Sequence, residues 1–248
     1  MKKSLLAVLM AGMTGMSAGA MQAQAEDSII SGDIGVYSQY MWRGMQQASG
    51  ASVQGDLGVD IVDGLSANVW FAAPLGNNVA GGNVTEFDWT IDYSGEVSGL
   101  SYSLGYIYYS YLNGVSGNTG EIYAGVGYGP VAVTYYYATN SNRGGWKKNS
   151  YFDIALSQNV AGFDLGADFG FYLGKKANAA NNQNNEFPTT KKGLGHVDLS
   201  ISKDVTLSDG VTMTPSLMVS IPTWKSDNPA TPRPKNTNQV VAAVNFSY

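Results

Sequence analysis

The sequence predicts an all-β protein, a transmembrane antiparallel up-and-down β-barrel of about 12 strands. The first observation behind this prediction is an alternation of polar and apolar residues, which is unbroken over residues 86–93, 163–169 and 196–202. The second is that no segment shows the sustained 3.6-residue period of an amphipathic helix. The third is the composition, with 31 glycines, 16 tyrosines and only 13% charged residues.

Alternating runs recur along the whole chain and are separated by turn-forming or polar segments. The predicted number of strands is even, as it is in single-chain bacterial barrels. Pro215 falls in the middle of one strand on its outward face, where it removes a ladder hydrogen bond, so we expect a bulge or a shifted boundary near it. We predict strands near residues 29–43, 51–62, 65–74, 84–94, 100–111, 120–128, 130–139, 149–158, 163–173, 193–203, 211–222 and 238–248.

The connections between these strands alternate between short and long. Asp63-Gly64 is a two-residue hairpin signal, Gly129-Pro130 and residues 159–162 are also short, and residues 95–99 and 204–210 are moderate in length. In bacterial outer-membrane barrels the short turns face the periplasm and the long loops face outward, so we expect both termini on the periplasmic side. The longer and more polar connections fall at residues 44–50, 75–83, 112–119, 140–148, 174–192 and 223–237.

The N-terminus contains the three regions of a secretory signal peptide in order. Lys2 and Lys3 are positive, residues 5–13 are apolar but too short to span a bilayer, and Ala23-Gln24-Ala25 is a small-x-small cleavage pattern. We therefore expect residues 1–25 to be a signal peptide and residues 26–248 to form a single barrel domain in the cell outer membrane.

The bulk composition excludes several classes of protein. The net charge is −5 and becomes more negative once Lys2 and Lys3 leave with the signal, which argues against general nucleic-acid binding. The chain has no cysteine, so it has neither a disulfide framework nor a thiolate metal site. After the signal, no apolar run approaches the ~18 residues of a transmembrane helix.

The placement of aromatic residues separates a membrane barrel from a soluble sandwich, which alternation alone does not do. Amphipathic rings favour the headgroup level of a bilayer, and the predicted outward faces carry them near both strand ends. Phe246-Ser247-Tyr248 also looks like the terminal strand that the outer-membrane barrel assembly machinery recognises. The expected interface aromatics are Tyr128, Phe163, Phe246 and Tyr248 at the periplasmic end and Trp42, Phe87, Tyr137, Phe152 and Phe171 at the opposite end.

The opposite face of each strand then predicts the lining of the barrel interior. Small inward residues, among them Gly105, Gly166 and Gly170, favour a water-filled path, although a loop such as residues 174–192 could fold in and narrow it. The excess of carboxylates predicts a preference for cations or neutral polar solutes; alternatively, these groups pair with Arg43, with each other or with water. Arg43 is either a constriction residue or an ion-paired structural group, and we favour the second. The predicted pore-lining residues are Asp33, Gln39, Arg43, Glu86, Asp88, Asp92, Glu121, Asp153, Asp164, Asp168, His196 and Asp198.

Two other functions compete with a channel. The only histidine, His196, has Asp198 on the same strand face, which would suit a hydrolase, but no Gly-x-Ser-x-Gly elbow accompanies it. One histidine without cysteine argues against a zinc site, and no P-loop or dinucleotide motif is present. The paired carboxylates of residues 84–94 could suggest a glycosidase, but paired acids are common on a polar wall. We therefore expect no catalytic residue, no metal and no cofactor. A non-conducting barrel with a structural or adhesive role is the third possibility, served by the long, Asn- and Lys-rich outer loops, whose basic residues would also attract lipopolysaccharide.

The first predicted strand and its exit carry a family resemblance. Residues 37–47 read Tyr-Ser-Gln-Tyr-Met-Trp-Arg-Gly-Met-Gln-Gln. This segment resembles the opening motif of the TorF family of proteobacterial porins, with Ser38, Tyr40, Trp42, Arg43, Gly44 and Gln47 matching in order and Gln39 standing where an acidic residue is common. The resemblance implies an outer-membrane channel for small solutes with no cofactor.

Overall fold

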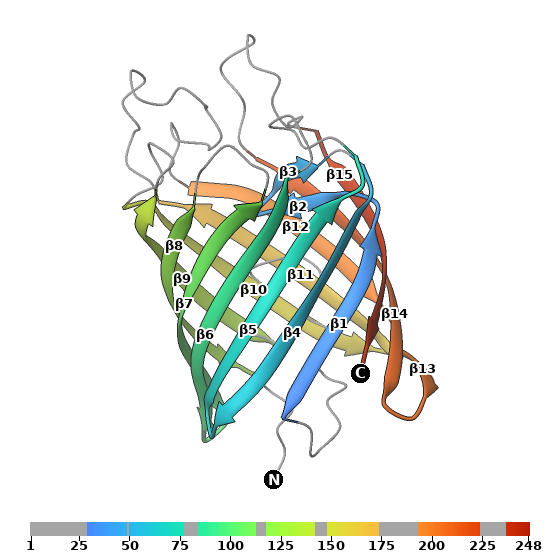
Figure 1. The fold of residues 1–248 in the computed structure, drawn as a ribbon, viewed down its shortest axis with the longest axis horizontal. Coiled ribbons are helices and arrows are strands. Elements are labelled where there is room, and N and C mark those ends of the chain that lie inside the picture. Colours follow the sequence, from blue (N-terminus) through green and yellow to red (C-terminus); the bar gives the residue numbers. More distant parts are fainter. Residues whose placement is uncertain are drawn as a thin grey trace.

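The computed structural model describes residues 29–48, 50–76, 84–112, 118–141, 148–173, 193–223 and 237–248. These residues contain strands and no helix, and the strands form a tilted barrel (Figure 1). The strands are β1 (Ile30–Tyr37), β2 (Tyr40–Trp42), β3 (Met45–Ala48), β4 (Ser52–Val62), β5 (Leu65–Pro74), β6 (Thr85–Val97), β7 (Leu100–Leu112), β8 (Thr119–Tyr128), β9 (Val131–Ser141), β10 (Ser150–Val160), β11 (Phe163–Tyr172), β12 (Gly193–Ser202), β13 (Val205–Ser208), β14 (Val211–Pro222) and β15 (Gln239–Ser247).

The main sheet closes on itself. Each strand from β4 to β12 pairs antiparallel with the next, β14 pairs with both β12 and β15, and β15 pairs with β1. The short strand β13 continues the line of β12 along β14, so the two together fill one position in the barrel. The result is a closed 12-strand antiparallel barrel, which confirms the predicted fold class.

Five two-residue turns join strands at one end of the barrel, which we call the turn end. They are residues 63–64, 98–99, 129–130, 161–162 and 209–210. Ser98 and Gly99 have φ of 53° and 81°, and Ala161 and Gly162 have φ of 53° and 79°, as the tight turn of a twisted hairpin requires. The connections predicted at 95–99 and 204–210 are thus shorter than expected, because β6 continues to Val97 and β13 extends the next hairpin.

Both described ends of the main sheet lie at the turn end, as predicted. Asp33 of β1 pairs with Ser247 of β15, and the Tyr248 N–H donates to the Gly32 carbonyl at 3.3 Å. The ladder between β1 and β15 leaves neither strand with an unpaired edge, which removes a site for edge-to-edge aggregation.

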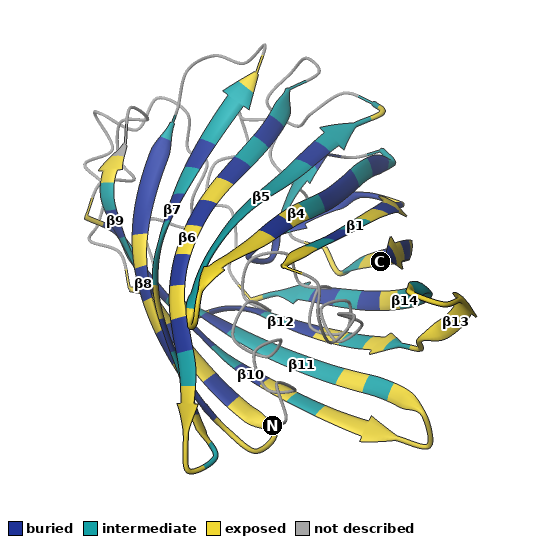
Figure 2. Cartoon of the chain, turned by 60° about the horizontal axis from the view of Figure 1, so that its bottom comes forward, coloured by how far each residue is buried: buried dark blue, intermediate teal, exposed yellow. Residues whose placement is uncertain are grey.

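Buried and exposed residues alternate along the strands of the barrel (Figure 2). Along β6, Glu86, Asp88 and Asp92 are buried, whereas Trp89 and Ile91 between them are about half exposed. The same alternation runs through β8 and β15. Polar groups therefore face inward and apolar groups outward, the reverse of a soluble sandwich. No helix among the described residues is long and apolar enough to cross a membrane.

The first predicted strand is wrong beyond residue 37. β1 ends at Tyr37, and β2 and β3 pair only with each other, joined by a turn at Arg43 and Gly44 with φ of 47° and 72°. We call residues 40–48 the inner hairpin, because most of its side chains are buried against the inner face of the barrel. The hairpin lies at the end of the barrel opposite the turn end (Figure 1). The chain leaves the wall at Ser38, whose N–H and side-chain oxygen still bond to Ala242 of β15.

Pro215 is accommodated by an interruption in the neighbouring strand. The ladder between β13 and β14 ends at Met213, and the ladder between β12 and β14 begins at Ser216. Pro215 lies between them, where its carbonyl accepts a bond from the Lys203 N–H at 3.2 Å. The irregularity expected near this proline is therefore the break between β12 and β13, with a register shift between Thr206 and Ser208.

Candidate functional site

The predicted lining residues lie on the inner face or on the segment that leaves β1. Asp33, Asp164 and Asp168 are half-buried. Asp56 also lies on the inner face, directly opposite Asp33 in the ladder between β1 and β4. It is not among the predicted lining residues, although it shares a strand face with Gln54 and Gly58. The buried members of the predicted set are Gln39, Arg43, Glu86, Asp88, Asp92, Glu121, Asp153, His196 and Asp198.

A buried ion pair joins the inner hairpin to the barrel wall. The Arg43 guanidinium donates from Nη1 to Glu121 Oε1 at 3.1 Å and from Nη2 to Glu121 Oε2 at 2.8 Å. The side chains of Arg43 and Glu121 are 0% and 1% exposed. The Tyr109 hydroxyl donates a further bond to Glu121 Oε2 at 2.9 Å, so both carboxylate oxygens are satisfied. Such a two-pronged contact fixes orientation as well as distance.

Aromatic rings surround the Arg43 guanidinium. Its central carbon lies 4.6 Å from the centre of the Trp42 ring, 4.5 Å from Tyr136 and 4.3 Å from Tyr151. Each ring face attracts the cation, and the attraction reaches about 2 kcal/mol for desolvated contacts. The barrel thereby compensates a guanidinium that has lost its water.

Further contacts hold the inner hairpin on several sides. The Tyr172 hydroxyl donates to the Arg43 carbonyl at 2.8 Å, and the Tyr40 hydroxyl donates to Glu86 Oε2 at 2.9 Å. Met45 is 1% exposed and belongs to a buried cluster with five tyrosines of the wall. The inner hairpin is thus an integral part of the packed interior.

Glycines of the inner face accommodate rings and do not leave open volume. A side chain added to Gly105 would collide with the Tyr123 ring, one on Gly170 would collide with His196 and the Tyr151 hydroxyl, and one on Gly195 would collide with the Tyr172 ring. The expectation that inward glycines indicate a water-filled path is therefore wrong at this level of the barrel. The narrowing segment is residues 40–48; the loop at 174–192, named as a candidate, lies outside the described residues.

Several inward residues toward the turn end are partly exposed. Asp33, Asp56 and Asp164 are half-buried there, and Asn68 and Ser157 share this partial exposure. The site therefore has two levels, a packed aromatic one at the inner hairpin and a more accessible acidic one below it.

The charge of the interior is strongly negative over the described residues. Arg43 is paired with Glu121, His196 lies beside Asp198, and the other described cations, Lys148 and Lys203, are exposed. Of the inward carboxylates, Asp88 and Asp153 each hold a buried oxygen without a hydrogen-bond partner.

The predicted interface aromatics need one correction. Trp42 faces inward, where its ring meets Tyr109 edge-on at 6.1 Å, because the chain has already left the wall at Ser38. Tyr128, Phe163, Phe246 and Tyr248 are exposed, and Phe87, Tyr137, Phe152 and Phe171 are partly exposed on outward positions. The structure adds outward Trp89, Tyr93 and Tyr135, which sequence alternation also predicts but the aromatic assignment omitted.

Within the described part of the chain, the neighbours of His196 are not those of a serine hydrolase. Its Nε2 lies 2.9 Å from the Tyr151 hydroxyl, and its Nδ1 lies 3.1 Å from Asp198 Oδ2. Since a tyrosine occupies the position where a serine nucleophile would accept or donate a proton, the described residues form no Ser-His-acid arrangement.

A family model described as a bacterial protein of unknown function (Gcw_chp) matches residues 22–212. The chain belongs to this family. No curated protein matches it.

Solved porins and channels have similar folds. The KdgM porin is 11% identical with a TM-score of 0.52, over 88% of this chain and 98% of that one. The NanC porin is 10% identical with a TM-score of 0.51 over the same shares. An outer membrane channel from Pseudomonas putida F1 is 10% identical with a TM-score of 0.52, over 92% of this chain and 97% of its own. At such identities the likeness concerns the fold.

Replacing Arg43 alone should destabilise the Gcw_chp barrel more than replacing the ion pair. Arg43→Met leaves the Glu121 carboxylate buried without its cation, and we expect the free energy of unfolding to fall by about 3–5 kcal/mol. Adding Glu121→Gln removes the orphaned charge while keeping an acceptor for Tyr109, so the double variant should recover part of the loss. Urea titration in detergent, followed by tryptophan fluorescence, measures both. A double variant less stable than Arg43→Met would contradict this account of the pair.

Proposed function

We propose that this protein is an outer-membrane channel for the passive passage of small polar solutes or ions, with a preference for cations or neutral solutes. The observation that carries the proposal is a closed barrel whose outer face is apolar and whose inner face is acidic. This is the arrangement of a protein that has lipid outside and a polar path inside. The predicted pore-lining residues, together with Asp56, would form that path.

The dimensions of the strands support a membrane location. Strands such as β5, β8 and β11 have 10 residues each, and a tilted strand needs about 9–11 residues to cross a bilayer. The outward aromatics at both ends would sit at the two headgroup levels, with lipid and lipopolysaccharide as their surroundings. We propose residues 1–25, which lie outside the described residues, as the signal peptide, and β15 as the strand recognised by the assembly machinery.

The acidic lining supports the proposed preference for cations or neutral solutes over anions. The solved structures include the KdgM porin in complex with disordered oligogalacturonate, a polyanion. Carboxylates on the inner face of the present chain would repel a polyanion, so we propose that it carries a different class of solute. The TorF-family label rests on the motif at residues 37–47, and within that motif Arg43 acts as the ion-paired structural group.

The inner hairpin favours one alternative, a barrel that conducts little at rest. Tyr40, Met41 and Met45 are almost fully buried, so this segment fills the interior at its own level. A structural or adhesive barrel with no open path would have the same feature. We propose no catalytic role, because the described neighbours of the His196 ring nitrogens are the Tyr151 hydroxyl and the Asp198 carboxylate, and neither is a serine nucleophile.

Single-channel current in a planar bilayer under a potassium chloride gradient tests the channel. We expect small, stable steps with a cation-selective reversal potential, and larger steps from Arg43→Met/Glu121→Gln because the inner hairpin is less firmly held. Asp33→Asn/Asp56→Asn should weaken the cation preference, whereas Asp60→Asn, which changes an exposed carboxylate of β4, should leave it unchanged. Anion selectivity would refute the role of the acidic lining, and silence from folded protein would favour the non-conducting barrel.

Arginine substitutions on β6 test whether the outward face of the barrel contacts lipid. Ile91 lies at the middle of β6 and Val97 at its turn end, and both are exposed on the outward face. Ile91→Arg should lower the free energy of unfolding in lipid vesicles by about 2–4 kcal/mol, whereas Val97→Arg should cost about 0–1 kcal/mol, because the penalty falls toward the interface. Equal costs at the two positions would count against a bilayer around β6.

A further inference from the structure

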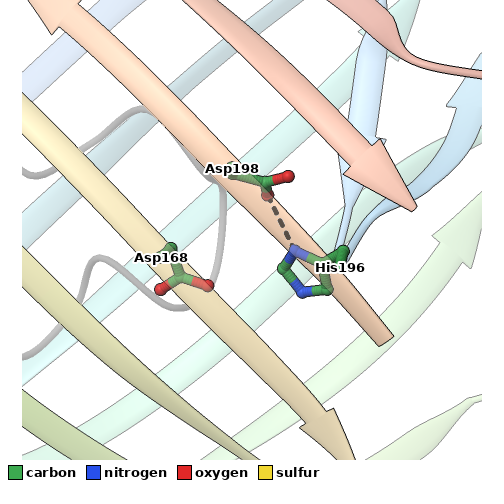
Figure 3. A group of neighbouring side chains, drawn as sticks. All are labelled: Asp168, His196 and Asp198. Atoms are coloured by element: carbon green, nitrogen blue, oxygen red, sulfur yellow. Dashed lines mark ion pairs between the residues drawn. The ribbon is translucent and has the colours of Figure 1, made fainter. Parts of the chain in front are cut away.

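A compact group of possible metal ligands lies on the inner face, next to the inner hairpin. Asp168 of β11 and His196 and Asp198 of β12 each offer one ligand atom, and these atoms lie within 4.8 Å of one another (Figure 3). Asp168 and Asp198 stand directly opposite each other in the ladder between β11 and β12. His196 precedes Asp198 by two residues and so shares its face.

The negative charge of this group favours the binding of a cation. The carboxylates of Asp168 and Asp198 repel each other, because like charges directly opposite each other in a sheet are destabilising. A third carboxylate is near, since Asp153 of β10 stands opposite Gly170 of β11, which in turn stands opposite His196. The neighbouring guanidinium of Arg43 is committed to Glu121. The described residues therefore supply two facing carboxylates with no cation of their own beyond the imidazole.

The hydrogen bonding of the group is incomplete in a way that indicates a ligand. His196 is 2% exposed, and its Nδ1 has no hydrogen-bond partner although Asp198 Oδ2 is only 3.1 Å away. The two atoms are therefore close, but their geometry does not meet the requirements of a hydrogen bond. Asp198 is 6% exposed with Oδ1 unpartnered, and Asp168 Oδ2 is also buried without a partner. One ligand atom from each of the three residues therefore lies close to the other two between the strands, in a group whose hydrogen bonding is incomplete.

The imidazole is already oriented by a second contact. His196 Nε2 lies 2.9 Å from the Tyr151 hydroxyl, and the two rings stack with an interplanar angle of 3°. Metal-binding histidines commonly use the other ring nitrogen in this way, which fixes the tautomer and the ring plane. Nδ1 is left as the nitrogen that can bind an ion.

We propose that Asp168, His196 and Asp198 form a binding site for a divalent transition-metal cation of the Zn²⁺ type. One imidazole nitrogen and two carboxylate oxygens suit such an ion, whereas Ca²⁺ and Mg²⁺ take oxygen ligands alone. Ligands about 2.0–2.2 Å from Zn²⁺ lie about 3.4 Å apart in a tetrahedron, so a small movement of these side chains completes the site. Asp168, the half-buried member, gives access from the more open level of the interior, and water would fill the remaining coordination position.

The site adjoins the inner hairpin. A side chain added to Gly44 would collide with Cβ of His196, so the turn at Arg43 and Gly44 lies against the residue that carries the imidazole. Bound metal would fix β12 at the point where the hairpin packs. A single histidine without cysteine predicts no zinc site from the sequence, but the two carboxylates of the proposed site come together only through the pairing of β11 with β12.

Calorimetric titration of folded, detergent-solubilised protein with zinc chloride tests the proposal, using protein purified without a polyhistidine tag. We expect one equivalent to bind and the affinity to fall more than about tenfold in Asp168→Asn and in Asp198→Asn, since even residues that only support a metal ligand are worth about 10–100-fold. Asp92→Asn is the matched control, because Asp92 is an inward carboxylate on β6 that binds Tyr123. Gel mobility with and without heating shows that each variant is folded.

A second readout follows the imidazole itself. The chain contains a single histidine, so its ring resonances in a nitrogen-15 spectrum belong to His196. Zinc should shift the Nδ1 resonance, and an excess of Mg²⁺ should not reverse the shift. An unchanged histidine resonance, or affinity retained in both Asp168→Asn and Asp198→Asn, would overturn the site.

Discussion

The structure depends on compensating one buried positive charge. Arg43 is the single arginine within the described residues, and it lies inside a barrel whose other inward charges are carboxylates. Burying an ion costs several kcal/mol unless excellent geometry and further hydrogen bonds offset the lost water. The two bonds to Glu121, the Tyr109 hydroxyl on the same carboxylate and three ring faces around the guanidinium supply that compensation. None of these partners would be satisfied if the chain continued as a lipid-facing strand.

The inner hairpin divides the interior because of this charge. On one side of it, tyrosines from neighbouring strands interlock, with ring centres 5.6 Å apart for Tyr123 and Tyr136 and 5.2 Å for Tyr151 and Tyr172. Toward the turn end the same wall carries half-buried carboxylates. A solute moving through the proposed path would cross the acidic level and then meet the hairpin. The proposed metal site lies at the boundary of the two levels, where β12 contacts Gly44.

Much of this architecture could be predicted from the sequence, since it follows from local rules. A period of two decides which residues share a face, so the inward position of Asp88 and the outward position of Ile91 require no knowledge of distant partners. Asp63-Gly64 specifies a tight turn by its backbone preference. Pro215 predicts an irregularity in the sheet, although the irregularity lies in the neighbouring strand, at the break between β12 and β13.

The inner hairpin could not be predicted in this way. Tyr40-Met41-Trp42 extends the apolar pattern of β1 without a visible break, so periodicity favours one long strand over residues 29–43. The contacts that decide otherwise are long-range: Glu121 lies 78 residues from Arg43, and Tyr172 lies 129 residues from it. The one local signal was Gly44, because glycine readily adopts a positive φ whereas Arg43, which also has a positive φ, belongs to a residue type that rarely does. The misassignment of Trp42 follows directly from the missed turn.

The central claim is that residues 40–48 are packed inside the barrel, and hydrogen exchange tests it most directly. Folded, unmodified protein in detergent would be transferred to deuterated buffer, digested after increasing times and examined by mass spectrometry. The account predicts that peptides covering the inner hairpin exchange as slowly as those of β1, because both are hydrogen-bonded and shielded from water. Complete exchange of residues 40–48 within seconds, while β1 stays protected, would contradict it.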